Sequence, residues 1–140
     1  MINKKRKSFI DCAVETAKIW SERSEDIHKK VGCCILDKNG RILSAGYNGL
    51  KPKMNKNKKF WLNRDQRRPY IFHAEINALS LVTKSDEPAI IATTLLPCKY
   101  CALNIASYDI KNVIYMEDYE RDQMAKRIFR FYNINLIKYK

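Results

Sequence analysis

Four residues of this sequence have the types and the spacing of a metal site with an adjacent acid. His73 precedes Glu75 by two positions, and Cys98 and Cys101 form a C-x-x-C pair after Pro97. One imidazole and two thiolates suit Zn²⁺, and three protein ligands leave the fourth tetrahedral position open for water, as in catalytic zinc sites. We therefore expect His73, Cys98 and Cys101 to bind Zn²⁺. Glu75, which is not needed as a ligand, is expected to be the general acid and base.

The combination of the two motifs is far more specific than either alone. Together they match the H-x-E…P-C-x-x-C signature of zinc-dependent base deaminases. Each motif is expected to open a helix, where free N–H groups and the helix dipole favour a cysteine thiolate. Such a site activates water for attack on C4 of a cytosine-type ring or C6 of an adenine-type ring, and the two motifs leave both ring types open.

The positive charge of the chain is concentrated in two segments. The chain has 27 Lys and Arg against 15 Asp and Glu, a formal net charge of +12. Residues 4–7 are all basic, and residues 51–68 carry a net charge of +7. Such segments attract phosphates on nucleotides or on nucleic acid, although a solvated tail and a solvated loop are the plainer interpretation.

The composition predicts a single folded domain spanning residues 1–140, because 46% of the residues are hydrophobic. No apolar run approaches the roughly 18 residues that a membrane span needs, and no signal-type segment follows Met1, so we expect a cytoplasmic protein. In such a compartment disulfides are not expected. Cys12, Cys33 and Cys34 are therefore interpreted as buried packing residues, the last two on opposite faces of one strand.

Hydrophobic spacing predicts alternating helices and strands. Helices are expected at 9–20, 73–82, 98–107 and 120–132. Strands are expected at 31–37, 41–46, 89–95, 112–116 and 134–138, the first two joined by an Asn39-Gly40 hairpin turn. Residues 49–70 lack periodicity and are expected to form a long loop with one helical turn near residues 60–62. The late alternation of strands and helices implies parallel crossovers, and therefore an α/β fold with both faces of the sheet covered.

Over roughly residues 9–138 the sequence resembles the deoxycytidylate (dCMP) deaminases of the cytidine deaminase superfamily. The resemblance is carried by the two motifs above and by Arg23-Ser24-Glu25-Asp26, Val31-Gly32, Gly46-Tyr47-Asn48-Gly49 and Val113-Ile114-Tyr115 with Tyr119. It implies a three-layer α/β/α sandwich with a five-stranded mixed sheet, Zn²⁺ as cofactor, and conversion of the deoxynucleotide dCMP to dUMP and ammonia. It also implies a homohexamer that is regulated by dCTP and dTTP.

The resemblance further assigns substrate-binding roles by motif position. Asn48 would contact the deoxyribose, Tyr119 would lie near the 5′-phosphate, and Ser24 would be on the phosphate side of the pocket with His28 as a weaker candidate. The basic loop at 51–70 lies between Asn48 and the metal motif and is therefore expected near the active site. Its last basic residues, Arg67 and Arg68, are the best placed to contact phosphate.

Two alternatives belong to other classes of protein. A nucleic-acid deaminase would explain the basic segments together with the aromatic residues near them, but the Gly-Tyr-Asn-Gly stretch favours a free nucleotide. A non-catalytic, nucleotide-binding zinc protein would not need the general base Glu75. The sequence leaves the choice between dCMP and dCTP open, because both share the same base and sugar.

Overall fold

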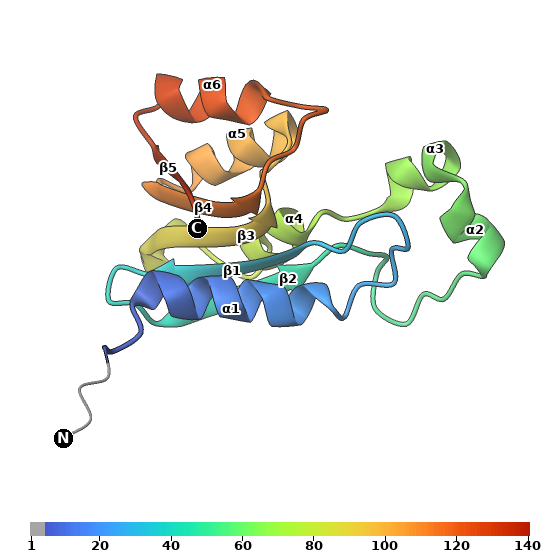
Figure 1. The fold of residues 1–140 in the computed structure, drawn as a ribbon, viewed down its shortest axis with the longest axis horizontal. Helices are drawn as coiled ribbons and strands as arrows, with labels where there is room; N and C mark the ends of the chain where they lie inside the picture. Colours follow the sequence, from blue (N-terminus) through green and yellow to red (C-terminus); the bar gives the residue numbers. More distant parts are fainter. Residues whose placement is uncertain (1–4) are drawn as a thin grey trace.

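A five-stranded mixed β-sheet organises the computed structural model, which describes residues 5–140 (Figure 1). Lys4, part of the N-terminal basic segment, lies outside the described residues. The strands lie in the order β2-β1-β3-β4-β5. Their bounds are β1 Gly32–Asp37, β2 Ile42–Tyr47, β3 Pro88–Leu95, β4 Asn112–Glu117 and β5 Asn135–Lys138. β1 pairs antiparallel with β2 and β3, whereas β3, β4 and β5 are parallel, so the predicted α/β class with parallel crossovers is confirmed.

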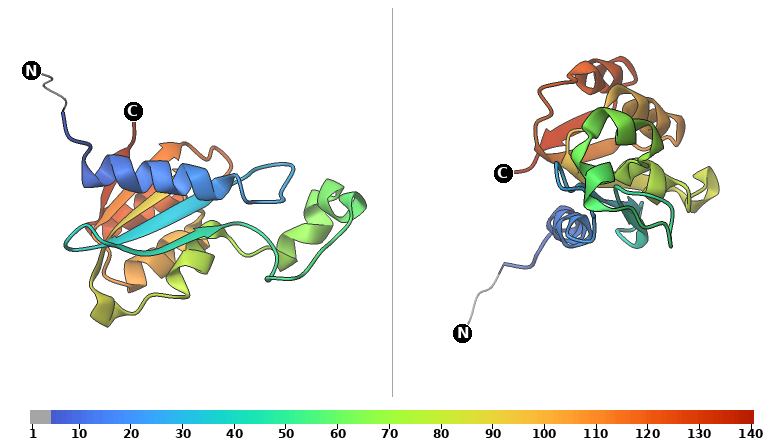
Figure 2. Two further views of the ribbon diagram at one scale, coloured as in Figure 1. Left: turned by 90° about the horizontal axis from the view of Figure 1, so that it is seen from below. Right: turned by 90° about the vertical axis from the view of Figure 1, so that its right-hand side faces the viewer.

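Helices cover both faces of the sheet (Figure 2). On one face α1 (Phe9–Ser21) packs through Ala13, Val14 and Ala17 against a cluster that includes Cys34 of β1. The other face is covered by α4 (Ala74–Leu79), α5 (Lys99–Ser107) and α6 (Met124–Phe131), whose core includes Cys33. The chain therefore forms the three-layer sandwich that the sequence predicted. None of the helices within residues 5–140 is long and apolar enough to cross a bilayer.

The cysteine predictions are partly confirmed. Cys33 and Cys34 are fully buried, and they belong to the two opposite core clusters, as the alternation of side chains along a strand requires. The predicted burial of Cys12 is wrong, because its side chain is exposed. Residue 12 lies on the far side of α1 from the stripe formed by Ala13, Val14 and Ala17.

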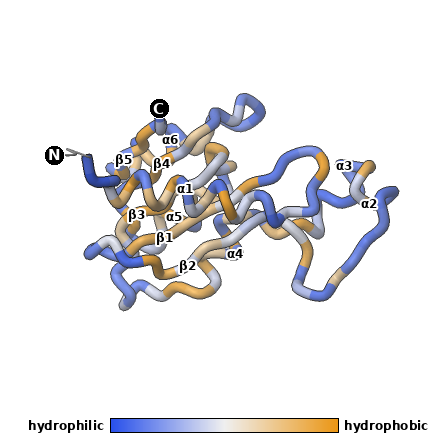
Figure 3. The backbone as a smooth tube through the Cα atoms, turned by 60° about the horizontal axis from the view of Figure 1, so that its bottom comes forward, coloured by the Kyte–Doolittle hydropathy of each residue, from blue (hydrophilic) through white to orange (hydrophobic). Residues whose placement is uncertain are grey.

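Residues 49–70 contain more helix than the sequence predicted. The segment projects beyond the end of the sheet and is mostly hydrophilic (Figures 1 and 3). It forms α2 (Lys58–Leu62), α3 (Arg64–Arg67) and the 3₁₀ turn η1 (Arg68–Tyr70). Asn57 and Asn63 cap the two short helices with their side chains, and a β-bridge between Gly49 and Phe72 closes the base of the segment. The segment is therefore a folded projection with fixed ends.

Two helix boundaries differ from the predicted ones. α4 ends at Leu79 and is followed by the 3₁₀ turn η2 (Lys84–Asp86), which Thr83 and Asp86 cap reciprocally. α6 begins at Met124 because Asp122 accepts the N–H of that residue and holds the preceding turn outside the helix. The Asp122 contact is a local side-chain bond to the backbone, which competes with continuation of a helix.

A close approach of β2 to α4 sets the place of the helix that follows His73. A Cβ atom on Gly46 would lie 2.7 Å from the carbonyl oxygen of Ala74 and 2.8 Å from the backbone nitrogen of Ala78. Both contacts would be with the backbone of α4, which cannot rotate away as a side chain can. Glycine is therefore needed at position 46 to let the helix lie against the strand.

We expect Gly46→Ala to lower the free energy of unfolding by about 2–3 kcal/mol, because α4 must move to admit the methyl group. The matched control is Gly49→Ala, where an added Cβ meets no atom within 4 Å and the expected change is within about 0.5 kcal/mol. Denaturant unfolding of the two variants measures the difference. Equal stabilities would show that the contact of β2 with α4 is not tight.

Candidate active site

The three predicted metal ligands converge where α4 and α5 begin. His73 is the N-cap residue of α4, Cys98 is the N-cap residue of α5, and Cys101 lies in the first turn of α5. The Nδ1 atom of His73 lies 3.5 Å from Sγ of Cys98 and 3.3 Å from Sγ of Cys101, and all three ligand atoms lie within 4.8 Å of one another. Nitrogen and sulfur atoms bound to one tetrahedral zinc ion would be about 3.5 Å apart. The donor set and its spacing therefore fit Zn²⁺.

The thiols and the imidazole of this cluster shift one another's pKa values. A hydrogen bond with Cys101 and the neighbouring His73 ring lower the pKa of the Cys98 thiol to about 4. The same hydrogen bond with Cys98, together with burial, raises the pKa of Cys101. Cys98 therefore loses its proton more readily than Cys101, whereas a bound metal ion would require both cysteines as thiolates.

The start of α5 is held in place by the next crossover of the sheet. The backbone N–H of Lys99 donates to Oδ2 of Asp122 at 2.8 Å, and Asp122 belongs to the connection between β4 and α6. Leu96 and Pro97, which precede the ligand Cys98, are buried. Cys98 is therefore flanked by buried residues on one side and by a hydrogen-bonded backbone N–H on the other.

Glu75 is buried one residue inside the start of α4, with 4% of its surface exposed. Burial raises the pKa of its carboxyl to about 7, before the charge of any metal ion is counted. A carboxyl that titrates near neutrality can both accept and return a proton at that pH. Glu75 lies two residues after the ligand His73 and lines the same cavity, as the motif predicts.

A cavity of about 1200 Å³ joins this cluster to the surface. His73, Glu75 and Cys98 form part of its wall. Many charged side chains also line the cavity: the basic ones are Lys29, Arg64, Arg67, Arg68, Lys99 and Arg121, and the acidic ones are Asp26, Glu117, Asp118, Glu120 and Asp122. Lys29 and Glu117 form an exposed ion pair, and Lys126 pairs with Asp118 at 2.9 Å. The cavity thus offers cations within reach of an anionic group.

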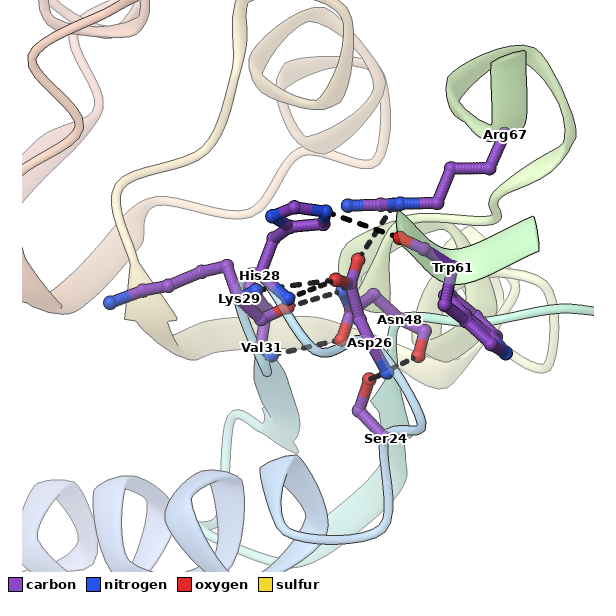
Figure 4. Close-up of polar contacts among 8 residues, drawn as sticks. All are labelled: Ser24, Asp26, His28, Lys29, Val31, Asn48, Trp61 and Arg67. Carbon is purple, nitrogen blue, oxygen red and sulfur yellow. Dashed lines mark hydrogen bonds and ion pairs between the residues drawn. The ribbon is translucent and has the colours of Figure 1, made fainter. Parts of the chain in front are cut away.

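The structure brings most of the predicted substrate-binding residues to this cavity. Asn48, Tyr119 and His28 line it, whereas Ser24 does not. The hydroxyl of Ser24 is buried and donates to the backbone oxygen of Asn48 at 2.8 Å (Figure 4). Ser24 therefore supports the backbone of Asn48 from behind the wall. The contacts predicted between these residues and a substrate stay predictions.

Arg67 and Arg68 both line the cavity but differ in environment. Arg68 is exposed, and no ion pair of its side chain is found within residues 5–140. Arg67 is buried, and its Nη1 atom lies 2.8 Å from Oδ2 of Asp26. The sequence analysis did not identify this ion pair, because its partners are 41 positions apart and no spacing rule links them. Asp26 appeared there only as part of the Arg-Ser-Glu-Asp stretch.

The donor set and the adjacent buried acid are those of a zinc-dependent deaminase, and comparisons with known proteins agree. Residues 3–117 match the family model described as the cytidine and deoxycytidylate deaminase zinc-binding region. A probable deoxycytidylate deaminase of Caenorhabditis elegans is 35% identical in an alignment of 117 residues that covers 79% of this chain and 57% of the relative. The deoxycytidylate deaminase of Pongo abelii is 30% identical in an alignment of 128 residues that covers 85% of this chain and 72% of the relative.

A solved structure has the same fold over nearly the whole chain. The dCMP deaminase of the cyanophage S-TIM5, in its apo form, superposes with a TM-score of 0.77 at 26% identity and covers 96% of this chain and 100% of its own. This chain belongs to the cytidine and deoxycytidylate deaminase family. The chain spans 57% of the length of the nematode relative. Membership of the family therefore does not by itself assign the activity of that whole relative to this chain.

We expect Cys98→Ser to weaken zinc binding by more than about 100-fold, because loss of a ligand costs more than loss of a group that supports one. The matched control is Cys12→Ser, which changes an exposed thiol outside the cluster and should leave about one zinc ion per chain. Metal analysis after dialysis against a competing chelator measures both. Equal zinc contents would remove Cys98 from the ligand set.

Proposed function

We propose that this protein is a zinc-dependent deaminase that converts dCMP and water to dUMP and ammonia. The observation that carries the proposal is the convergence of one imidazole and two thiolates beside a buried carboxyl in one cavity. A structural zinc site needs neither an open coordination position nor a general base. The substrate is supported by relatives that carry the name deoxycytidylate deaminase at 30–35% identity and by the cyanophage dCMP deaminase.

Bound zinc acts as a Lewis acid that lowers the pKa of water toward neutrality. Glu75 would accept one proton from the attacking water and pass it to the ring nitrogen N3. It would then take the second water proton from the hydroxyl group now on C4 and give it to the amino group, so that the C4–N bond breaks and ammonia departs. Burial keeps bulk water away from the Glu75 carboxyl and raises its pKa. His73, Cys98 and Cys101 hold the metal beside this carboxyl.

The substrate-binding roles predicted from the sequence are part of the proposal. Asn48 would contact the deoxyribose through the second lone pair of Oδ1. Oδ1 accepts only the N–H of Val31 among the described residues, whereas the two hydrogens of Nδ2 have acceptors in the backbone oxygen of Lys29 and Oδ2 of Asp26. Tyr119 and His28 would lie on the phosphate side, with Ser24 supporting the backbone of Asn48. Arg68 is the stronger phosphate candidate of the two arginines, because the guanidinium of Arg67 already pairs with a carboxylate.

Assembly, regulation and location are also proposed, on more limited grounds. A homohexamer and control by dCTP and dTTP follow from the sequence resemblance alone. In the dCMP deaminases that the sequence resembles, Gly-Tyr-Asn-Gly is usually followed by x-Pro-x-Gly. This chain has Leu50-Lys51-Pro52-Lys53 at those positions, and Lys53, in place of the glycine, has a left-handed backbone with a φ of 69°. A cytoplasmic location is supported by the described cysteines, which are all free thiols.

The direct test of the mechanism is Glu75→Gln, which keeps the size of the side chain but cannot carry the proton. We expect kcat for ammonia release from dCMP to fall by about 10²–10⁴-fold while the zinc content stays unchanged. Measuring metal and turnover on the same preparation separates loss of the base from loss of the site. Full turnover by the zinc-loaded variant would rule out Glu75 as the general acid and base.

The phosphate role of Arg68 predicts a change in KM. Arg68→Glu places a negative charge beside the substrate phosphate, so KM for dCMP should rise by about tenfold or more, with a smaller fall in kcat. Arg41→Glu is the control, because it reverses an exposed charge on the β1–β2 hairpin, outside the cavity. If both variants gave the same KM, Arg68 would be a solvated side chain and nothing more.

A further inference from the structure

A cluster of polar contacts, buried at its centre, joins the projecting segment 51–70 to the wall of the cavity (Figure 4). We call it the Asp26 cluster, and it consists of Ser24, Asp26, His28, Lys29, Val31, Asn48, Trp61 and Arg67. Its central contact is the ion pair of Asp26 with Arg67, whose side chains are each only 5% exposed. The mechanism proposed above makes no use of this pair.

The ion pair is not explained by stability alone. Removing two charges from water is costly, and a buried pair offsets that cost only when its remaining polar atoms are also satisfied. The Nε atom of Arg67 is buried without a hydrogen-bond partner. Its guanidinium carbon lies 5.7 Å from the centre of the Trp61 ring, so the group rests beside an indole instead of in water. A buried pair with an unsatisfied atom is weak evidence for a stabilising role, and a role in fixing local geometry is the hypothesis developed below.

Asp26, held by Arg67, also forms hydrogen bonds with the turn that follows it. Its Oδ1 atom accepts the backbone N–H of His28 at 2.8 Å and that of Lys29 at 3.2 Å, while its Oδ2 atom binds Arg67. His28 is held a second time, because its Nε2 atom lies 3.1 Å from the backbone oxygen of Trp61 in α2. Residues 26–29 are therefore tied to the projecting segment at two points.

Asn48 connects the same turn to the substrate wall. Its Oδ1 atom accepts the N–H of Val31 at 2.9 Å, and its Nδ2 atom donates to the backbone oxygen of Lys29 at 2.9 Å. Asp26 and Asn48 thus hold the turn 26–31 from its two ends. Asn48, His28 and Lys29 all line the cavity that contains Glu75.

We propose that Arg67 is a positioning residue for substrate binding. Through Asp26 it fixes the turn 26–31 and the side chain of Asn48 on the wall of the cavity, so the projecting segment 51–70 sets the shape of the nucleotide site. The chain of contacts runs from Arg67 to Asp26, from Asp26 to the amides of residues 28 and 29, and from there to Asn48. The kinetic part of this proposal rests on the proposed function, whereas the structural part does not.

The structural part is tested by amide hydrogen exchange, resolved by residue with NMR, on the zinc-loaded protein without substrate. Arg67→Met should speed exchange at the amides of His28 and Lys29 by about tenfold or more, because Asp26 loses the cation that orients it. The control is Lys38→Met, which breaks an exposed ion pair with Glu87 remote from the cavity. Unchanged protection of both amides in Arg67→Met would overturn the proposal, even if the wild type never turned over dCMP.

The kinetic part is tested by the split between KM and kcat. We expect Arg67→Met to raise KM for dCMP by about tenfold or more while kcat stays within about threefold and the zinc content is unchanged. Arg67→Lys restores a cation to Asp26 and should recover most of the lost affinity, although lysine offers a point charge without the planar fork. A fall in kcat at constant KM would contradict the positioning role.

A double variant keeps the test valid if Arg67→Met does not fold. Asp26→Asn with Arg67→Met removes both charges and should fold at least as well as the single variant, because no unpaired charge stays buried. If the pair served stability alone, this double variant would restore both the Tm and the KM. The positioning role predicts that the Tm recovers while the KM stays raised.

Discussion

The proposed site depends on one constraint: donor atoms from the starts of two separate helices must all lie within bonding distance of a single metal ion. His73 begins α4 and Cys98 begins α5, 25 residues later in the chain. One turn of helix rises about 5.4 Å along its axis. A shift of either helix by one turn would therefore separate the donor atoms of His73 from those of the two cysteines by several ångströms. The absence of a side chain at Gly46 and the contact of Asp122 with the start of α5 both serve this convergence. The core on that face of the sheet fixes the two helices relative to β1 and β3.

The parts of the fold that follow from local pattern could be predicted from the sequence. The stripe on α1, the Asn39-Gly40 hairpin and the alternation of later strands and helices are all local signals, and the structure has each of them. The clustering of His73, Cys98 and Cys101 could be predicted for the same reason, because their residue types and short spacings lie in two stretches of the chain. The place of Glu75 beside this cluster followed from its position two residues after His73.

Features that depend on distant contacts could not be predicted. Short helices without an apolar period were only partly predicted as well: the helical turn expected near residues 60–62 is present as α2, but α3, capped by Asn63, was not expected. The pairing of Arg67 with Asp26 joins residues whose separation carries no signal. Charge alone does not distinguish Arg67 from the other seven cations of the segment 51–68, but its side chain is buried and paired with Asp26. Charge counting treats Arg67 and Arg68 alike, whereas their surroundings differ.

The measurement that tests the account most directly is ammonia release by the zinc-loaded wild-type protein offered dCMP, dCTP, deoxycytidine, CMP and a cytosine-containing single-stranded oligonucleotide in parallel. The account predicts strong turnover of dCMP and much weaker turnover of the other four, because the proposed site would hold zinc beside contacts for one phosphate and one deoxyribose. Turnover of the oligonucleotide with none of dCMP would contradict it, and so would zinc-loaded protein that is silent on every substrate.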